Sequence, residues 1–299
     1  MKLFITGGTG FVGTHLCNVF LNDGWQVTAT GTSLTHRLSG MENFTYIVAD
    51  TTEKGAWQDS VKDADAVVNL AGRSIFNFWT ENYKSQIYDS RILTTRNLVE
   101  SLDAGRRTTL LSASAAGYYG SRGEDLLPES AEPGSDFLAR VCVEWEAEAL
   151  RAEEKGARVV LMRFGVIMGR GGGALAKMMP AFKFYVGGPL GNGMHWFPWL
   201  HLDDLTAATL FLLQAPDAAG AFNFCAPQAV RYKTFARTLG QQLGRPSFMK
   251  TPAFVLKLIA GEMGSTLLSS QRAVPAKLEQ AGFSFRYPEL DAALGEIVN

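Results

Sequence analysis

Short runs of β-branched and aromatic residues alternate with longer amphipathic stretches over the first half of the chain. The runs occupy residues 2–6, 26–30, 44–48, 66–70, 108–113 and 158–163. Between them, apolar residues recur with the spacing of a helix over 11–23, 80–103 and 136–155. Strands and helices that alternate in this way predict a parallel sheet covered on both faces, the doubly wound α/β architecture.

The pattern changes after about residue 165. Glycine-rich loops, two further helical stretches and one short strand follow, over residues 169–173, 187–193, 203–214, 231–243 and 222–224. This change predicts a first domain over residues 1–165, to which the chain returns around 195–225. A smaller C-terminal α+β region over residues 166–299 is expected to hold or cover the substrate.

Composition describes a globular chain with a sizeable core, since 46% of its 299 residues are hydrophobic and its net charge is −1. Without a basic excess, nucleic acid is not an expected partner. The apolar runs are shorter than a membrane span and no leader precedes the first strand, so we expect a cytoplasmic protein. Three widely spaced cysteines predict neither a disulfide nor a metal site. We expect a small-molecule substrate and a monomer or homodimer.

The segment TGGTGFVG places Gly7, Gly10 and Gly13 immediately after the first strand pattern and at the opening of the first helix pattern. Gly7 permits a tight turn, Gly10 lets a pyrophosphate approach the backbone, and Gly13 lets the helix pack closely on the strand. The N–H groups of Phe11 and Val12, at the start of the helix, can bind phosphate. A glycine-rich turn without a ligand is the alternative, but the combination of strand, spacing and helix favours a dinucleotide.

The end of the second strand pattern selects between NAD and NADP. An acidic residue there would bind the ribose 2′-hydroxyl of NAD, but no acid follows until Glu42. Thr32, Ser33 and Arg37 instead offer hydroxyls and a guanidinium, which suit a 2′-phosphate. We therefore expect NADP(H), with a solvated loop as the alternative.

Two further segments are assigned to the cofactor site. Asp50 follows the third strand pattern. Leu70, Ala71 and Gly72 belong to the turn NLAG after the fourth, where small residues would let the chain pass close to a ribose. A turn of small residues required only for packing is the alternative.

The segments TGGTGFVG, NLAG, LLSASAAGYYG and LHLDD resemble motifs of the extended short-chain dehydrogenase/reductases, the group of nucleotide-sugar epimerases and dehydratases. RFGVIMGRGGGAL, GGPLGNGMHWFPWLHLDD and AGFSFRYPELDAAL are similar to its "epimerase family" subgroup. Members of that subgroup end in a C-terminal domain of unknown function and are sometimes labelled cell-division inhibitors. The resemblance covers essentially the whole chain. It implies a Rossmann-type domain that binds NADP at the carboxyl ends of the strands.

The chain departs from the larger family on one helix. Enzymes of that family use a Tyr-x-x-x-Lys pair for proton transfer, but the segment DFLARVCVEWE contains neither residue type. Aligning Glu146 with the acid that usually follows the lysine puts Leu138 and Cys142 at the two positions. A shift by one residue puts Phe137 and Val141 there.

Two candidates for proton transfer follow the fifth strand pattern. The Ser114 hydroxyl can donate to a substrate oxygen, with a purely structural bond at the strand end as the alternative. Tyr119 matches a structural turn of the resembled family, which leaves Tyr118 as the freer phenol. Both Ser114 and Tyr118 are assigned as catalytic candidates.

The substrate half departs from the family as well. Epimerases that hold a sugar diphosphate usually show Arg-Asp before the His-x-Asp-Asp segment, but Phe197 and Pro198 stand there. A nucleotide-diphosphate sugar is therefore not the expected substrate, although two arginines remain available elsewhere, Arg231 and Arg272. The aromatic segment MHWFPWLH favours an apolar substrate, and core packing is the alternative role of these side chains.

The sequence also predicts positions or roles for four further groups of polar or aromatic side chains. Phe184 and Tyr185 are expected near the substrate. Asp203 or Asp204 is expected to cap the next helix, and His201 to make a structural hydrogen bond. Three acids of one helix are expected to be solvated and ion-paired: Glu144, Glu146 and Glu148.

Two functions remain open from the sequence. One is an NADP(H)-dependent oxidoreductase or epimerase-like enzyme with an altered acid and base. The other is a non-catalytic NADP-binding sensor or regulatory protein, because the phosphate-binding loop persists while the proton-transfer pair is absent.

Overall fold

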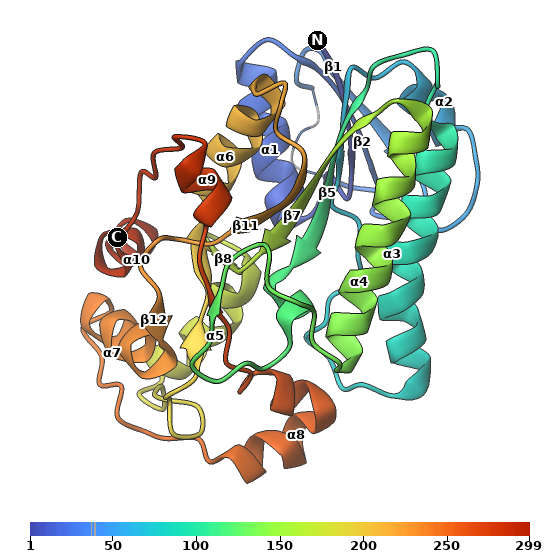
Figure 1. Ribbon diagram of the computed structural model, residues 1–299. Helices are drawn as coiled ribbons and strands as arrows, with labels where there is room; N and C mark the ends of the chain where they lie inside the picture. The colour runs from blue at the N-terminus through green and yellow to red at the C-terminus, as the bar shows by residue number, and fades with distance from the viewer. Residues whose placement is uncertain (37, 39) are drawn as a thin grey trace.

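Seven parallel strands form the central sheet in the order β11-β7-β5-β4-β1-β2-β3, in a computed structural model that describes residues 1–36, 38 and 40–299 (Figure 1). The strands are β1 (Lys2–Thr6), β2 (Gln26–Gly31), β3 (Phe44–Val48), β4 (Ala66–Asn69), β5 (Thr109–Ala115), β7 (Arg158–Phe164) and β11 (Gly220–Phe224). The predicted fold class is confirmed. The order reverses between β1 and β4, and ligands of such sheets bind beyond the carboxyl ends of strands at this point.

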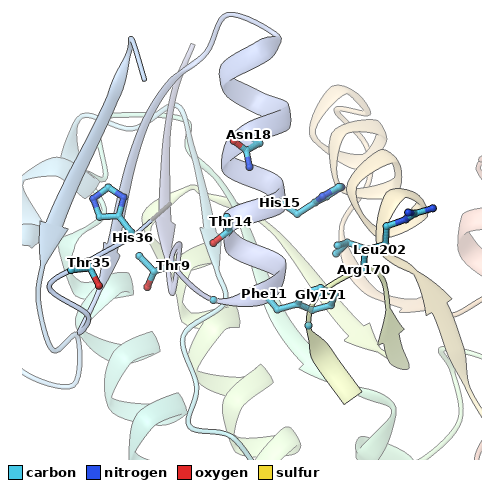
Figure 2. A pocket seen from close by; sticks show the side chains of 12 residues that line it. Thr9, Phe11, Thr14, His15, Asn18, Thr35, His36, Arg170, Gly171 and Leu202 are labelled. Atoms are coloured by element: carbon cyan, nitrogen blue, oxygen red, sulfur yellow. The ribbon is translucent and has the colours of Figure 1, made fainter. Parts of the chain in front are cut away.

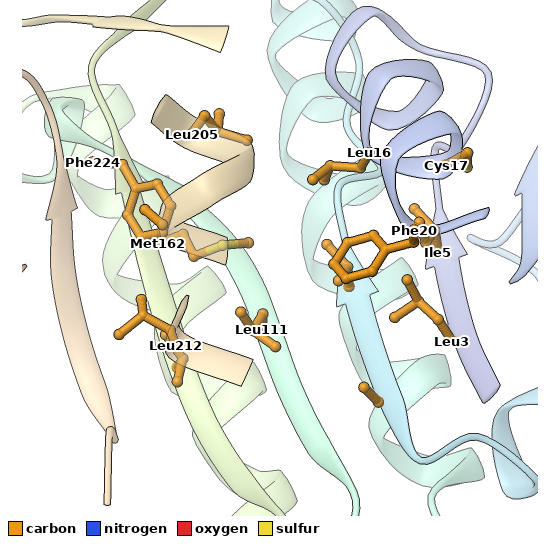
Figure 3. Close-up of a cluster of buried hydrophobic side chains, with 14 of the residues drawn as sticks. Leu3, Ile5, Leu16, Cys17, Phe20, Leu111, Met162, Leu205, Leu212 and Phe224 are labelled. Carbon is orange, nitrogen blue, oxygen red and sulfur yellow. The ribbon is translucent and has the colours of Figure 1, made fainter. Parts of the chain in front are cut away.

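Helices cover both faces of the sheet (Figure 1). One face carries α1 (Phe11–Asn22) and α6 (Leu202–Gln214), and the other carries α2 (Trp57–Lys62), α3 (Glu81–Ser101) and α4 (Phe137–Leu150), with the single turn η2 (Arg151–Lys155) after it. Figure 3 shows how the first layer packs: Leu16 and Phe20 of α1 and Leu212 of α6 lie among strand residues such as Ile5 and Leu111. All five are fully buried, so hydrophobic burial fixes α1, and with it the loop that precedes it, against the sheet.

The chain returns to this sheet after residue 165. β11 pairs with β7 in parallel, with Phe224 opposite Phe164, and α6 packs beside α1. Within the described residues, none of the helices combines the length and the apolar character that a membrane crossing requires.

Short strand pairs and helices form the remaining layer below the carboxyl ends of the central strands (Figure 1). The pairs are β8 (Val166–Met168) with β10 (Trp199–His201), β9 (Trp196–Phe197) with β12 (Val230–Arg231), and β6 (Leu126–Leu127) with β13 (Arg272–Ala273). The helices are η1 (Ala116–Tyr119), α5 (Gly173–Lys183), α7 (Tyr232–Gln242), α8 (Ala253–Thr266) and α10 (Leu290–Val298). The short helix α9 (Ala276–Gln280) instead packs on the central sheet beside β11, with Leu278 in the same core cluster as α1 and α6. The expectation of loops after Gly169 missed α5, because its helix starts on the last of the clustered glycines.

The start of α6 differs from the sequence prediction. Its N-cap is His201, whose Nδ1 accepts from the N–H of Asp203 at 3.1 Å. Asp204 is fully buried and accepts the backbone N–H groups of Arg286 and Tyr287 at 2.6 and 2.9 Å. The expectation that one of the two acids caps the helix is therefore wrong. Asp204 instead anchors the C-terminal segment to α6.

Candidate functional site

The loop between β1 and α1 has a backbone that its glycines alone permit. Gly7 has a φ of +67°, and a Cβ on Gly13 would lie 2.3 Å from the Gly7 carbonyl oxygen. Gly10 is the N-cap of α1 and provides no side chain to accept the first N–H groups of the helix. The N–H groups of Phe11, Val12 and Gly13 therefore remain available to an anion, and the helix dipole favours one there.

Two polar cavities open on this loop. The first, which we name the α1 cavity, has a volume of about 650 Å³ (Figure 2). Its described lining contains no carboxylate and includes Thr9, Gly10, Phe11, Thr35, His36 and Arg170. Figure 2 shows Thr9, Thr35 and His36 together on one side of the start of α1, with Arg170 on the other. Arg170 is paired with Glu296, the Nε to Oε1 distance being 3.0 Å.

The second cavity, which we name the β4 cavity, has a volume of about 450 Å³. It brings together seven of the residues assigned to the cofactor from the sequence: Gly7, Gly10, Thr32, Asp50, Leu70, Ala71 and Gly72. Two buried oxygen atoms of its lining, Thr30 Oγ1 and Gln86 Oε1, have no hydrogen-bond partner. Buried polar atoms are rarely left without a partner, so these two fit a ligand with polar groups of its own.

One residue assigned to the 2′-phosphate from the sequence, Ser33, does not line these cavities. The Ser33 hydroxyl closes a local turn instead, donating to the Thr35 carbonyl oxygen at 2.7 Å and accepting the Thr35 N–H at 3.3 Å. Arg37 lies outside the described residues. Thr35 and His36, which the sequence analysis passed over, take the place next to Thr9.

A third cavity, the apolar pocket, has a volume of about 390 Å³ and lies below the carboxyl ends of β5 and β7. Phe11 belongs to its lining as well as to the α1 cavity, so residues 7–12, which comprise the loop before α1 and the start of the helix, border all three cavities. Its walls come mostly from apolar side chains and small residues, among them Val12, Ala115, Leu138, Phe164, Phe197 and Pro198. No lysine or arginine occurs in its described lining.

A buried ion pair fixes the ends of the strands beside this pocket. Arg163 on β7 donates through Nε and Nη2 to the two carboxylate oxygens of Glu146, each at 2.8 Å, and both side chains are at most 7% exposed. Burial alone would lower the pKa of Arg163, but the hydrogen bonds and charge of Glu146 raise it. The prediction that Glu146 is solvated is therefore wrong: Glu144 is exposed, and Glu146 faces the interior.

The two catalytic candidates lie around this ion pair and not in the lining of the apolar pocket. The Ser114 hydroxyl is buried and donates to Glu146 at 2.6 Å. The Tyr118 ring lies under the Arg163 guanidinium, with 3.5 Å from Cζ to the ring centroid. Tyr119 accepts from Arg163 and donates to Asn223 at 2.7 Å, and burial raises the pKa of its phenol to about 12. In this arrangement Ser114 and Tyr118 support the turn after β5.

One cation beside the cavities was missed from the sequence. The Arg91 guanidinium packs so closely on Gly72 that a Cβ there would lie 3.1 Å from Cζ, and it lies 5.2 Å from the centroid of the Trp145 ring. Its Nη1 donates to the Ile87 carbonyl oxygen at 2.9 Å. No carboxylate among the described residues pairs with it, and burial lowers its pKa. No local signal marks Arg91, because its position depends on the packing of α3 against the turn after β4.

Residues 3–225 of the chain match the NAD dependent epimerase/dehydratase family, and residues 251–297 match a domain of unknown function, DUF1731. The chain belongs to the epimerase/dehydratase family. The DUF1731 segment includes α8 and α10 and supplies one wall of the apolar pocket, through Thr266 and Leu267 among others.

Relatives match this member of the epimerase/dehydratase family over its full length. A chloroplastic "Epimerase family protein SDR39U1 homolog" of Arabidopsis thaliana is 38% identical over 100% of this chain and 87% of its own. An epimerase family protein of Staphylococcus haemolyticus is 39% identical over 100% of both chains. The crystal structure of human epimerase family protein SDR39U1 with NADPH is 30% identical, with a TM-score of 0.88 over 100% of this chain and 99% of that one.

The member described here differs from the family's enzymes where the Tyr-x-x-x-Lys pair is expected. Leu138 lines the apolar pocket, whereas Phe137 packs on Trp79 with ring centroids 5.4 Å apart. This orientation supports the register that aligns Glu146 with the family's acid. Cys142 is buried, and burial raises the pKa of its thiol to about 12. The helix therefore presents no group that exchanges a proton near neutral pH.

Only some of the aromatic and cationic side chains considered for the substrate line the apolar pocket. Phe197 and Pro198 line the apolar pocket, but Phe184 and Tyr185 are exposed and do not line it. The two arginines considered for a sugar diphosphate stack instead on the Trp196 ring, with Cζ to centroid distances of 4.1 Å for Arg231 and 4.5 Å for Arg272.

We predict that Glu146→Gln lowers the free energy of unfolding by about 3 kcal/mol, because it leaves the buried Arg163 charge without its counter-charge. Urea unfolding followed by circular dichroism measures the change. The matched variant Glu144→Gln, on the exposed face of the same helix, should leave the stability nearly unchanged. Equal losses in the two variants would contradict a special role for the buried pair.

Proposed function

We propose that this chain binds NADP(H) and acts as an oxidoreductase of the extended short-chain dehydrogenase/reductase type on a small, largely apolar substrate. The observation that carries the proposal is the meeting of two polar cavities and one apolar pocket at residues 7–12, the loop before α1 and the start of the helix. The human relative whose crystal structure contains NADPH supports the cofactor.

The two polar cavities fit a dinucleotide phosphate. The free N–H groups at the start of α1 would hold the pyrophosphate. Thr9, Thr35 and His36 would meet the 2′-phosphate in a cavity whose described lining has no carboxylate to repel it. Asp50 and the turn Leu70–Gly72 would border the two nucleosides, where Thr30 and Gln86 need partners.

The nicotinamide end would lie next to the apolar pocket, because residues 7–12 border the pocket as well as the two polar cavities. NADPH, when bound, supplies a hydride to an electrophilic carbon. Arg91, the half-buried cation beside Gly72, would donate hydrogen bonds to the ribose in place of the absent lysine. The absence of lysine and arginine from the described lining of the apolar pocket disfavours a nucleotide-diphosphate sugar and favours an uncharged substrate.

Cofactor selectivity gives one test. We predict that NADPH binds about tenfold tighter than NADH, the equivalent of one charge-assisted hydrogen bond to the 2′-phosphate. Thr35→Val should weaken NADPH and leave NADH unchanged, because only the 2′-phosphate reaches this side of the loop. Fluorescence titration of the reduced nicotinamide measures both affinities. Equal affinities in the wild type would sink the assignment of NADP(H).

Turnover gives the second test. With neutral aromatic aldehydes, ketones and quinones, we predict that the protein oxidises NADPH faster than the Gly10→Val variant does. A valine fits the local backbone, since Gly10 has φ −71° and ψ 175° and its Cβ would approach only the Gly7 oxygen, at 3.2 Å. Its side chain would nevertheless fill space beside the first N–H groups of α1.

The control for this variant is Gly55→Val, whose Cβ would meet only Trp57, at 3.5 Å. It should bind and oxidise NADPH like the wild type, and circular dichroism should be native in both variants. Tight NADPH binding without oxidation by any compound of the panel would contradict the oxidoreductase and favour a non-catalytic NADP-binding sensor.

A further inference from the structure

Two polar side chains form one end of the apolar pocket. His195 and Tyr232 both line it, from the start of β9 and from the start of α7. Their rings stack, with centroids 4.9 Å apart and planes at 28°, and the Tyr232 N–H donates to the His195 carbonyl oxygen at 3.0 Å. Because both the backbone and the rings are in contact, the two side chains form one rigid unit.

The hydrogen-bonding groups of this unit are unused. His195 is 8% exposed, and its Nε2 is buried without a partner. Within the described part of the chain, neither imidazole nitrogen nor the Tyr232 hydroxyl makes a hydrogen bond. A buried donor or acceptor without a partner costs about 1–3 kcal/mol, so the fold does not gain from placing His195 Nε2 here unless something else binds it.

The charges around His195 and Tyr232 indicate whether the group that binds them is charged. Asp136 is the one carboxylate in the described lining of the pocket, and its Oδ1 already accepts the N–H of Ala139 at 2.9 Å. Burial lowers the pKa of His195 to about 4, so its imidazole is neutral at neutral pH. In a neutral imidazole, Nε2 carries either an N–H or a lone pair, according to the tautomer, and either one suits an uncharged oxygen.

We infer that His195 and Tyr232 bind the oxygen of an uncharged, largely apolar carbonyl compound, or of the alcohol derived from it. In one tautomer Nε2 carries the N–H, which donates to a carbonyl oxygen, and in the other it carries the lone pair, which accepts from a hydroxyl, so one side chain serves both oxidation states. The inference deepens the proposed function by naming the substrate class. A packing role alone would need only two stacked rings, and phenylalanine would then replace His195 without loss.

The test compares two probes that differ in one oxygen, acetophenone and ethylbenzene. Binding to the protein saturated with NADP⁺ is measured by calorimetry, since the oxidised cofactor cannot reduce the ketone. The wild type should prefer acetophenone by about fivefold to tenfold, the worth of a neutral hydrogen bond. His195→Phe should remove this preference and keep the affinity for ethylbenzene. Tyr232→Phe should reduce the preference, and Tyr88→Phe, at a half-buried tyrosine of α3 outside the pocket lining, should not.

Three results would overturn the inference: no preference in the wild type, an unchanged preference in His195→Phe, or no binding of either probe. If His195→Phe does not fold, the nitrogen NMR signals of the His195 imidazole in the wild type decide instead. They should shift with acetophenone and not with ethylbenzene. The same comparison without cofactor separates this inference from the proposed function, because failure of NADP⁺ to bind would leave the preference between the probes intact.

Discussion

The buried pair of Arg163 and Glu146 holds together the ends of the strands on which the apolar pocket depends. Through Tyr119 and Asn223 it connects β7, α4, the turn after β5 and β11. Asn223 in turn donates to the carbonyl oxygens of Leu127 and Val274 at 3.0 and 2.9 Å, which ties in β6 and the segment after β13. A charge pair in this position is costly to desolvate, but each of its polar atoms has a partner, so its geometry is fixed.

This network gives Ser114, near the end of β5, and Tyr118, in the turn after it, a structural role. Ser114 and Tyr118 contact the ion pair, so their hydroxyl and ring serve the turn that leads to Ala115 and Gly117 at the edge of the apolar pocket. The lining of the pocket itself contains His195, whose buried Nε2 has no partner, and the lining of the β4 cavity contains the unpartnered oxygen atoms of Thr30 and Gln86. Three of the four buried side-chain atoms without partners in the described residues therefore lie where ligands are proposed, and the fourth is Arg272 Nε. The polar atoms around Arg163 are satisfied within the chain.

The sequence predicts local features well and tertiary ones poorly. The strands of the central sheet and the turn at Gly7 follow from β-branched runs and glycine spacing, since both depend on neighbours in the chain. Glu146 looked solvated because it lies between two other acids, and its partner Arg163 is on another element. Arg91 was missed for the same reason, because the packing of α3 against the turn after β4 brings it to Gly72. Thr35 and His36 lie in the predicted 2′-phosphate loop, but residue type alone does not show which of its side chains face the cavity. The absence of the Tyr-x-x-x-Lys pair, with Leu138 and Cys142 at its two positions, was predictable from the sequence, because it depends only on residue types at a known spacing.

The central claim is that one dinucleotide spans the two polar cavities and presents its nicotinamide to the apolar pocket. A crystal structure of the complex with NADPH tests it most directly. The account predicts the pyrophosphate on the N–H groups at the start of α1, the 2′-phosphate beside Thr35 and His36, and the nicotinamide ring at the opening of the pocket near Ala115. A nicotinamide directed away from the pocket, or a phosphate bound away from the loop before α1, would contradict it.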